Sequence, residues 1–229
     1  MFIQLWDFSN YLTVYYKHMK NILCFGDGNT YGFNPETGGR YGKNERWTGI
    51  LQDLLKEHYN IIEEGRNART VIFKDFTDIK TCGVDFLPYC LNIYPNIDMI
   101  IIMLGINDFQ TLFRASVDDV LDGIRTIVDL IRVSEYHKNT KILFLAPPNI
   151  SEDVKGCKFG CMFDEKSVQK SKHYAEKLKI LAEKLNCSFF NLNDIIKTCS
   201  EDGIHINSFE HKKVANTVAD LVLQLLPVM

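Results

Sequence analysis

The chain has 229 residues, of which 46% are hydrophobic, and this length and composition are typical of a single globular domain. Its formal net charge of −3 at pH 7 gives no electrostatic basis for binding nucleic acid or an anionic membrane surface. No stretch is apolar over a length that spans a bilayer, so we expect no membrane insertion. The cysteines are scattered and odd in number, which indicates reduced thiols and a cytoplasmic location.

Residues 1–18 are rich in aromatic side chains but lack the basic start and the uninterrupted apolar run of a signal peptide. We interpret 1–18 as an N-terminal extension that packs on the surface or on a neighbouring subunit, and 19–229 as a single domain. The alternative is that Met19 is the natural start of the chain.

The rest of the chain alternates short apolar runs with apolar residues at helical spacing. In chain order we expect a strand at 21–25, a helix at 47–55, strands at 59–62 and 97–104, a helix at 117–131, a strand at 142–146, a helix at 175–185, a strand at 188–192 and a helix at 214–225. Ser116, with Asp119 three residues later, predicts an N-cap for the helix at 117–131. The alternation predicts an α/β fold, namely a three-layer α/β/α sandwich, flavodoxin-like, with about five parallel strands.

Ligands of open α/β sheets bind beyond the carboxyl ends of the strands, and the chemically informative residues of this chain follow such ends. Segments 26–28, 64–70, 105–108, 147–163 and 202–205 follow the expected strands, so we expect them to converge on one rim. The segment 147–163 is rich in Pro, Gly, Asn and Cys, which favours a surface loop and makes it a candidate lid. Its close pair Cys157 and Cys161 lacks a second Cys/His pair, so we expect no metal site.

Each candidate residue on this rim has a plain structural explanation when it is taken alone. Asn107-Asp108 suits a turn after a strand, and Asp202-Gly203 suits a turn or a helix cap. His205 is one of six histidines and by itself is typical of a surface residue. The cations Arg40, Arg66, Arg69 and Arg114 are better explained by surface or structural pairs than by substrate binding.

Taken together, three short blocks resemble the SGNH (GDSL) hydrolase family. Gly26-Asp27-Gly28-Asn29 is similar to its first block, Gly105-Ile106-Asn107-Asp108 to its G-x-N-D block, and Asp202-Gly203-Ile204-His205 to its D-x-x-H block, in the family's order. Segments 46–49, 63–70 and 101–105 are more closely similar to the bacterial arylesterase/acyltransferase branch. The resemblance covers 20–226. It implies hydrolysis of small, short-chain acyl or aryl esters, acyl transfer to other acceptors, no cofactor and a homo-oligomer.

The resemblance also implies roles for individual residues. His205 would be the general base and then the acid, and Asp202 would orient its ring and stabilise the imidazolium. The oxyanion donors would be the backbone N–H of residue 28, the backbone N–H of Ala68 and the side-chain amide of Asn107. The family often has glycine where Ala68 stands, and a backbone donor tolerates either residue.

Four further residues are candidates for substrate binding because they flank these blocks, namely Asp27, Tyr31, Phe33 and Asn67. Tyr31 and Phe33 would sit by the mouth of the pocket and shape the acyl site. Core packing explains these two aromatic residues nearly as well.

Gly28 is the serious departure from the family pattern, because serine normally fills this place as the nucleophile. Its N–H remains and the hydroxyl is missing, so we expect an ester site that is formed but nearly inactive. Loss of the nucleophile from such a triad costs on the order of a million-fold in turnover. The room left by the absent side chain would admit a water beside His205, which would allow slow direct hydrolysis.

We interpret Gly28 as an engineered substitution, because the remaining residues of the blocks are intact. The alternative is a natural non-catalytic homologue that binds an ester or a carbohydrate ligand. A third class, a flavodoxin-like cofactor binder, has less support. The run 26–32 nearly matches G-x-G-x-x-G, but its third glycine comes one residue late, and Asn34-Pro35 breaks any helix soon after.

Overall fold

The structure is a computed structural model that describes residues 19–228. The predicted extension at 1–18 lies outside the described residues, as does residue 229. In the described part of the chain, no helix is long and apolar enough to cross a membrane. All seven cysteines lie in this part and carry free thiols.

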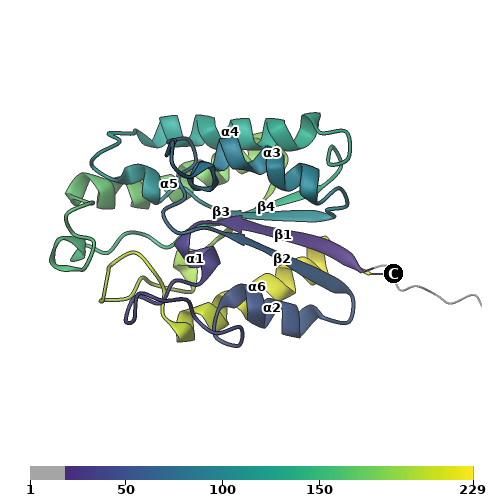
Figure 1. Cartoon of the computed structure of the whole chain (residues 1–229), viewed down its shortest axis with the longest axis horizontal. Helices are drawn as coiled ribbons and strands as arrows, with labels where there is room; N and C mark the ends of the chain where they lie inside the picture. Colours follow the sequence, from purple (N-terminus) through teal and green to yellow (C-terminus); the bar gives the residue numbers. More distant parts are fainter. Residues whose placement is uncertain (1–18, 229) are drawn as a thin grey trace, which may run out of the picture.

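The centre of the molecule is a five-stranded sheet in the order β2-β1-β3-β4-β5, in which every neighbouring pair is parallel. The strands are β1 (Lys20–Gly26), β2 (Tyr59–Gly65), β3 (Met99–Met103), β4 (Lys141–Ala146) and β5 (Ser188–Asn191). This is the flavodoxin-like order, so the predicted three-layer sandwich is confirmed. The strands alternate with helices, which lie on both faces of the sheet (Figure 1).

Strand β3 explains why the centre of the sheet reads as an unbroken apolar run. Ile100 and Ile102 pack into the core on one face, and Met99, Ile101 and Met103 pack into the core on the other. A strand that is covered on both faces has no solvent side and needs no polar alternation.

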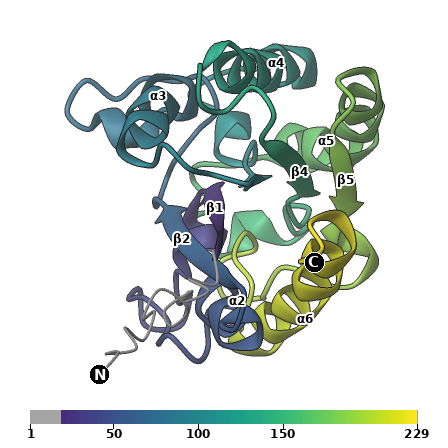
Figure 2. The ribbon, with the colours of Figure 1, turned by 90° about the vertical axis from the view of Figure 1, so that its right-hand side faces the viewer.

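Helices α3 (Gly83–Ile93), α4 (Val117–Val133) and α5 (Glu165–Lys184) cover one face, and α2 (Trp47–Leu55) and α6 (Ser208–Leu225) cover the other (Figure 2). The N-cap predicted for α4 is confirmed, because Ser116 Oγ accepts from the N–H of Asp119 at 3.1 Å and Asp119 Oδ2 accepts from the N–H of Ser116 at 2.8 Å. The short elements are α1 (Gly28–Tyr31) and the 3-10 turns η1 (Ile79–Thr81), η2 (Asn107–Phe109), η3 (Val154–Gly156) and η4 (Leu192–Asp194).

The loops that follow the carboxyl ends of the strands gather at one end of the sheet, at the left of Figure 1, next to α1. Parallel strands make this convergence unavoidable, since all their carboxyl ends share one edge. Sequence-distant loops thereby form one rim, as the positions of the blocks predict.

Candidate active site

Asp202 and His205 form a closely coupled pair on the loop after β5. Asp202 is fully buried, and its Oδ2 lies 2.7 Å from Nδ1 of His205. Its Oδ1 accepts from the backbone N–H of Ile204 at 2.9 Å and of His205 at 2.8 Å. Burial alone would raise the pKa of Asp202, but the hydrogen bonds and charge of His205 outweigh burial, so this pKa is lowered. The carboxylate therefore stays ionised at neutral pH, and Nδ1 is the ring nitrogen that carries the proton.

Asn29 fixes the backbone on both sides of His205. Its Nδ2 donates to the carbonyl of Ile204 at 3.3 Å, and its Oδ1 accepts from the N–H of Ile206 at 3.1 Å. The carbonyl of Asn29 accepts from the indole N–H of Trp47 at 3.1 Å, which anchors the residue from the opposite side. Sequence reasoning did not identify this role, because a single buried Asn carries no pattern that links it to a loop far along the chain.

Gly28 and His205 are in direct contact. A Cβ placed on Gly28 would lie 2.3 Å from Nε2 of His205 and 2.9 Å from its Cδ2, closer than real Cβ atoms approach other atoms. The imidazole thus occupies the room that a side chain at position 28 would need. This corrects the expectation that a water fills that room.

The three expected oxyanion donors belong to three different loops. Gly28 begins α1, and the side chain of Asp27 caps this turn by accepting from the N–H of Asn29 at 3.0 Å. Ala68 has a left-handed backbone with a φ of 59°. Within residues 19–228, neither the N–H of Gly28 nor that of Ala68 is hydrogen-bonded, so both are available to a ligand.

Asn107 is held by neighbours that leave part of its amide free. Its Nδ2 donates to the carbonyl of Arg69 at 3.1 Å, and its Oδ1 lies 3.5 Å from Nε2 of Gln110. An amide nitrogen carries two hydrogens, so the second one can point into the adjacent hollow.

A small pocket of about 120 Å³ joins these loops. The rings of Phe33 and Phe159 lie 4.5 Å and 6.2 Å from the imidazole of His205, measured between ring centroids. The expected lid segment 147–163 therefore contributes directly to the wall. The lining residues are Phe33, Asn67, Ala68, Asn107, Gln110, Phe159, Met162, Phe163, Ile204 and His205. Five of these were not predicted as individual site residues, because their place depends on how the loops pack: Gln110, Phe159, Met162, Phe163 and Ile204. All of them except Gln110 lie in the predicted segments 147–163 and 202–205.

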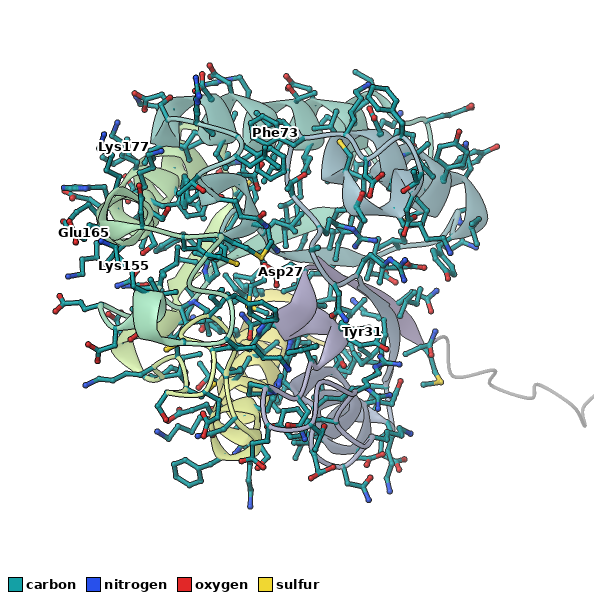
Figure 3. The ribbon with its side chains drawn as sticks, turned by 60° about the vertical axis from the view of Figure 1, so that its left-hand side comes forward. Asp27, Tyr31, Phe73, Lys155, Glu165 and Lys177 are labelled. Carbon is teal, nitrogen blue, oxygen red and sulfur yellow. The ribbon has the colours of Figure 1, made fainter. Side chains whose placement is uncertain are left out.

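Two of the residues proposed for substrate binding do not line this pocket. The ring of Tyr31 packs instead against the guanidinium of Arg40, which lies 4.6 Å from the ring centroid. Asp27 is buried beneath α1, and burial raises its pKa to about 6. Figure 3 places Asp27 near the middle of the rim and Tyr31 farther out. Of the four candidates, Phe33 and Asn67 reach the pocket wall.

The arginines near the blocks have mainly structural partners. Arg69 is buried, and it donates to the carbonyls of Gly26, Glu64 and Lys80 beneath the rim. Burial lowers the pKa of Arg69 to about 10. Arg40 pairs with Glu63 and Arg66 pairs with Asp78, whereas Arg114 forms no ion pair within the described chain.

Asp108 is the buried support of the 70–72 segment behind the pocket. Its carboxyl accepts from the N–H of Val71 at 2.8 Å and of Ile72 at 3.2 Å. Burial raises the pKa of Asp108 to about 7, although these hydrogen bonds act to lower it.

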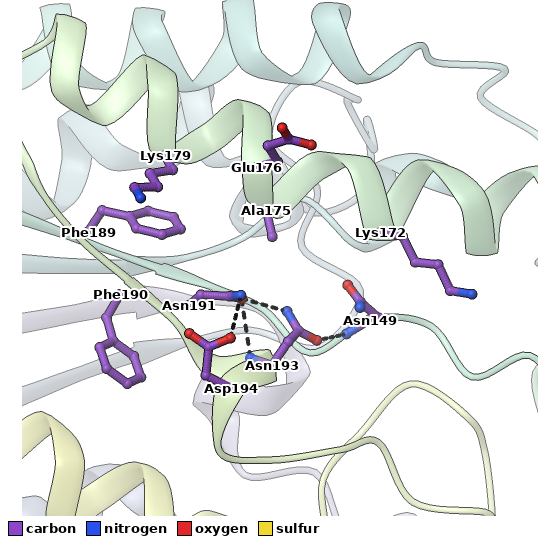
Figure 4. Close-up of a pocket in the computed structure, with 10 residues that line it drawn as sticks. All are labelled: Asn149, Lys172, Ala175, Glu176, Lys179, Phe189, Phe190, Asn191, Asn193 and Asp194. Carbon is purple, nitrogen blue, oxygen red and sulfur yellow. Dashed lines mark hydrogen bonds between the residues drawn. The ribbon is translucent and has the colours of Figure 1, made fainter.

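A second hollow, about 520 Å³, lies between α5 and the edge strand β5 (Figure 4). Its asparagines bond mainly to one another, since the N–H of Asn149 donates to Asn193 Oδ1 at 2.7 Å and Asn193 Nδ2 donates to Asn191 Oδ1 at 2.9 Å. No residue of the blocks lines this hollow. We therefore assign the candidate site to the smaller pocket beside His205.

Comparison with known proteins places the chain in one family. The profile of the GDSL-like lipase/acylhydrolase family matches residues 24–210. A search of curated protein sequences gives no match.

Solved structures give closely similar folds. An inhibitor-bound aryl esterase from M. smegmatis is 34% identical, with a TM-score of 0.83, over 90% of this chain and 100% of that one. A carbohydrate acetylesterase family member from Sinorhizobium meliloti is 30% identical, with a TM-score of 0.84, over 92% of this chain and 100% of that one. The family profile and the similar solved structures each cover most of the described residues. The chain therefore belongs to the GDSL-like lipase/acylhydrolase family, whose members include SGNH hydrolases.

Proposed function

We propose that this chain carries a carboxylic ester site for short-chain acyl or aryl esters, in which Gly28 stands where the serine nucleophile would be. The observation that carries the proposal is the contact between Gly28 and His205. Nε2 of His205 faces the position of a side chain at residue 28, while Nδ1 is held by the buried Asp202. A serine at this position would meet a general base whose tautomer is already set by Asp202, once the ring has shifted back to make room for the side chain.

The roles follow from this geometry. His205 would take and return the proton, and Asp202 would keep its ring in the correct tautomer. The N–H groups of Gly28 and Ala68 and the amide of Asn107 would stabilise the developing oxyanion. Two observations support this assignment: Ala68 and Asn107 line the pocket, and the N–H groups of Gly28 and Ala68 have no hydrogen-bond partner within residues 19–228.

The pocket supports a small acyl group as the bound portion of the substrate. Its volume is about 120 Å³, and Phe33, Phe159, Met162, Phe163 and Ile204 make its wall mostly apolar. The similar proteins named as aryl esterases and carbohydrate acetylesterases share the ester bond and differ in the alcohol. We therefore propose that this pocket binds the acyl side of the ester. Acyl transfer, a cytoplasmic location and a homo-oligomer stay predictions.

The missing hydroxyl dominates the expected rate. Without a nucleophile, a site of this kind loses on the order of a million-fold in turnover, which corresponds to roughly 8 kcal/mol of barrier. Oxyanion donors and binding alone still retain on the order of a thousand-fold over water. Weak ester hydrolysis by the chain itself is consequently expected.

The test compares Gly28→Ser with Gly28→Ala, using 4-nitrophenyl acetate. Both variants place a Cβ 2.3 Å from Nε2, so in both the imidazole must shift by about 1 Å to reach the 3.4 Å of ordinary contact. Only serine adds a nucleophile. We expect Gly28→Ser to exceed Gly28→Ala by on the order of a thousand-fold or more. Equal, background rates from two folded variants would overturn the proposal.

A second candidate function is a natural non-catalytic homologue that binds an ester or a carbohydrate ligand. The contact of the imidazole with Gly28 favours it, because the site is packed around a glycine rather than left open. The codon at position 28 in the genomic copy of the gene separates this candidate from an engineered substitution. Calorimetry with a non-hydrolysable acyl amide then measures binding without turnover.

A further inference from the structure

Nε2 of His205 stands beside the place that the missing nucleophile would take. It is the ring atom nearest to a Cβ built on Gly28, at 2.3 Å, where real Cβ atoms essentially never have a non-bonded neighbour under 3.0 Å. In a serine hydrolase the base must stay one hydroxyl group farther back. Here the base has moved forward into the position of the group that it would activate.

The electronic state of the ring suits attack by nitrogen. Asp202 Oδ2 lies 2.7 Å from Nδ1 and holds the proton there, so the lone pair of the neutral ring is on Nε2. The His205 side chain is 13% exposed and lines the small pocket together with Ala68 and Asn107. An ester carbonyl in the pocket would therefore lie beside Nε2 and beside two of the expected oxyanion donors, the N–H of Ala68 and the side-chain amide of Asn107. Histidine is among the side chains that form covalent intermediates.

We propose that His205 itself is the nucleophile of this chain, and that it hydrolyses esters of acidic alcohols through an acyl-imidazole formed at Nε2. The inference rests on the ester site proposed above and adds a reaction path to it. Nε2 would attack the ester carbonyl carbon in place of the absent serine hydroxyl, and Asp202 would stabilise the positively charged ring that results.

Each step of this path balances with water as the only other reactant. The Nε2 lone pair forms a bond to the carbonyl carbon, and the carbonyl electrons move to oxygen, where the donors of Gly28, Ala68 and Asn107 receive them. Collapse of this intermediate breaks the ester C–O bond and releases an aryloxide. Water then attacks the acyl carbon and its proton passes to the aryloxide or to solvent. The C–N bond breaks, which returns the neutral ring and releases the carboxylic acid.

The leaving group decides whether the path works. A nitrophenolate is about as weak a base as imidazole, so a substantial share of the intermediate collapses forward to the acyl-imidazole. An alkoxide is a worse leaving group, so the intermediate expels imidazole and returns to the ester. A serine nucleophile or a water activated by His205 would not impose this restriction, because neither forms a nitrogen–carbon bond. Selectivity for aryl over alkyl acetates is thus the signature of the path.

The experiment uses the unaltered chain with 4-nitrophenyl acetate and ethyl acetate. We expect saturable hydrolysis of the aryl ester and background rates for the alkyl ester. Mass spectrometry after a rapid quench should find one acetyl group on the peptide that contains His205, and hydroxylamine added before the quench should remove it. His205→Gln should reduce the aryl rate to that of buffer. His173→Gln removes an exposed histidine on α5, should leave the rate unchanged and controls for surface acylation.

Two results would overturn the inference. One is hydrolysis of aryl and alkyl acetates at similar rates without an acetylated His205 peptide, which would indicate a water path. The other is an aryl rate no higher than that of His205→Gln. If Gly28→Ser then hydrolyses both esters, the ester site stands and only the histidine path fails. If Gly28→Ser is also inactive, the proposed function fails as well.

Discussion

Ala68 is held in a conformation that its side chain disfavours. Its φ of 59° lies in the left-handed region, which costs an L-residue with a Cβ about 1–2 kcal/mol. Glycine would relieve that cost, at the expense of roughly 0.5–1 kcal/mol of unfolded-state entropy. We expect Ala68→Gly to raise the free energy of unfolding by about 0.5–1 kcal/mol in urea titrations. The donor N–H at position 68 would be retained.

The matched control for this substitution is Ala219→Gly, which lies inside α6. A helical backbone gives glycine no conformational gain, and the substitution also removes a buried methyl group, so we expect a loss of about 1–2 kcal/mol there. A loss of similar size at position 68 would contradict the assignment of strain to Ala68.

His211 couples stability to pH through a ring that stays neutral in the fold. It is fully buried, and its Nδ1 accepts from the N–H of Trp47 at 3.3 Å. Burial first, and then the charge of His205, lower the pKa of His211 to about 3. In the unfolded chain this pKa is about 6.5. Below pH 6.5 His211 takes up a proton in the unfolded chain but stays neutral in the folded chain, which favours unfolding. The contribution of His211 to the free energy of unfolding is therefore complete above pH 6.5 and is lost as the pH falls toward 3.

The measurement is the unfolding free energy of the chain minus that of His211→Gln, at pH 7 and pH 5. Glutamine can accept from the same N–H and does not titrate. Since the buried carboxyls are common to both proteins, their contributions cancel in the difference. We expect the difference to fall by about 2 kcal/mol between the two pH values. A difference that is independent of pH would show that the pKa of His211 is the same in the folded and the unfolded chain.

At the scale of elements, the side chain of Asn29 links the first turn after β1 to the loop after β5. Asn29→Ala would leave the N–H of Ile206 and the carbonyl of Ile204 without partners, and an unpaired buried group costs about 1–3 kcal/mol. We expect a loss of about 2–4 kcal/mol in the free energy of unfolding. In the Gly28→Ser background, turnover should fall as well, because the loop carries His205.

The control for this variant is Asn60→Ala, which removes an exposed asparagine from β2. Surface substitutions of this kind stay within about 0.5 kcal/mol. Equal effects at positions 29 and 60 would show that Asn29 does not hold the loop.

Sequence reasoning identified the elements with strong periodicity and overlooked those without it. Four of the five strands were predicted to within about two residues, because buried parallel strands are short, dense apolar runs. Strand β2 continues three residues beyond its predicted end at 62, through the polar residues Glu63 and Glu64 to Gly65. Helix α3 was not predicted, since Pro88 lies inside it and interrupts the expected pattern. Helix α5 begins at Glu165, well before the apolar stripe at 175–185, because the cap of Asp164 and Ser167 starts it.

At the scale of the whole molecule, the convergence of the blocks could be predicted and the arrangement of their side chains could not. A parallel sheet brings Gly28, Asn107 and His205 to one rim by topology alone. The advance of the imidazole into the room beside Gly28 and the outward position of Tyr31 depend on side-chain packing between loops. That packing is set by residues such as Asn29, and no local spacing rule describes it.

The most direct test of the ester site is covalent labelling of position 28 by a fluorophosphonate, read by mass spectrometry. A fluorophosphonate reacts with a hydroxyl group that an oriented base activates. The phosphonyl oxygen of the adduct then accepts hydrogen bonds from the oxyanion donors of the site. We expect Gly28→Ser to gain a single adduct at position 28, Gly28→Ala to gain none, and His205→Gln to abolish the adduct in the Gly28→Ser background. A folded Gly28→Ser protein that remains unlabelled would contradict the central claim that Gly28, His205 and the oxyanion donors surround one ester site.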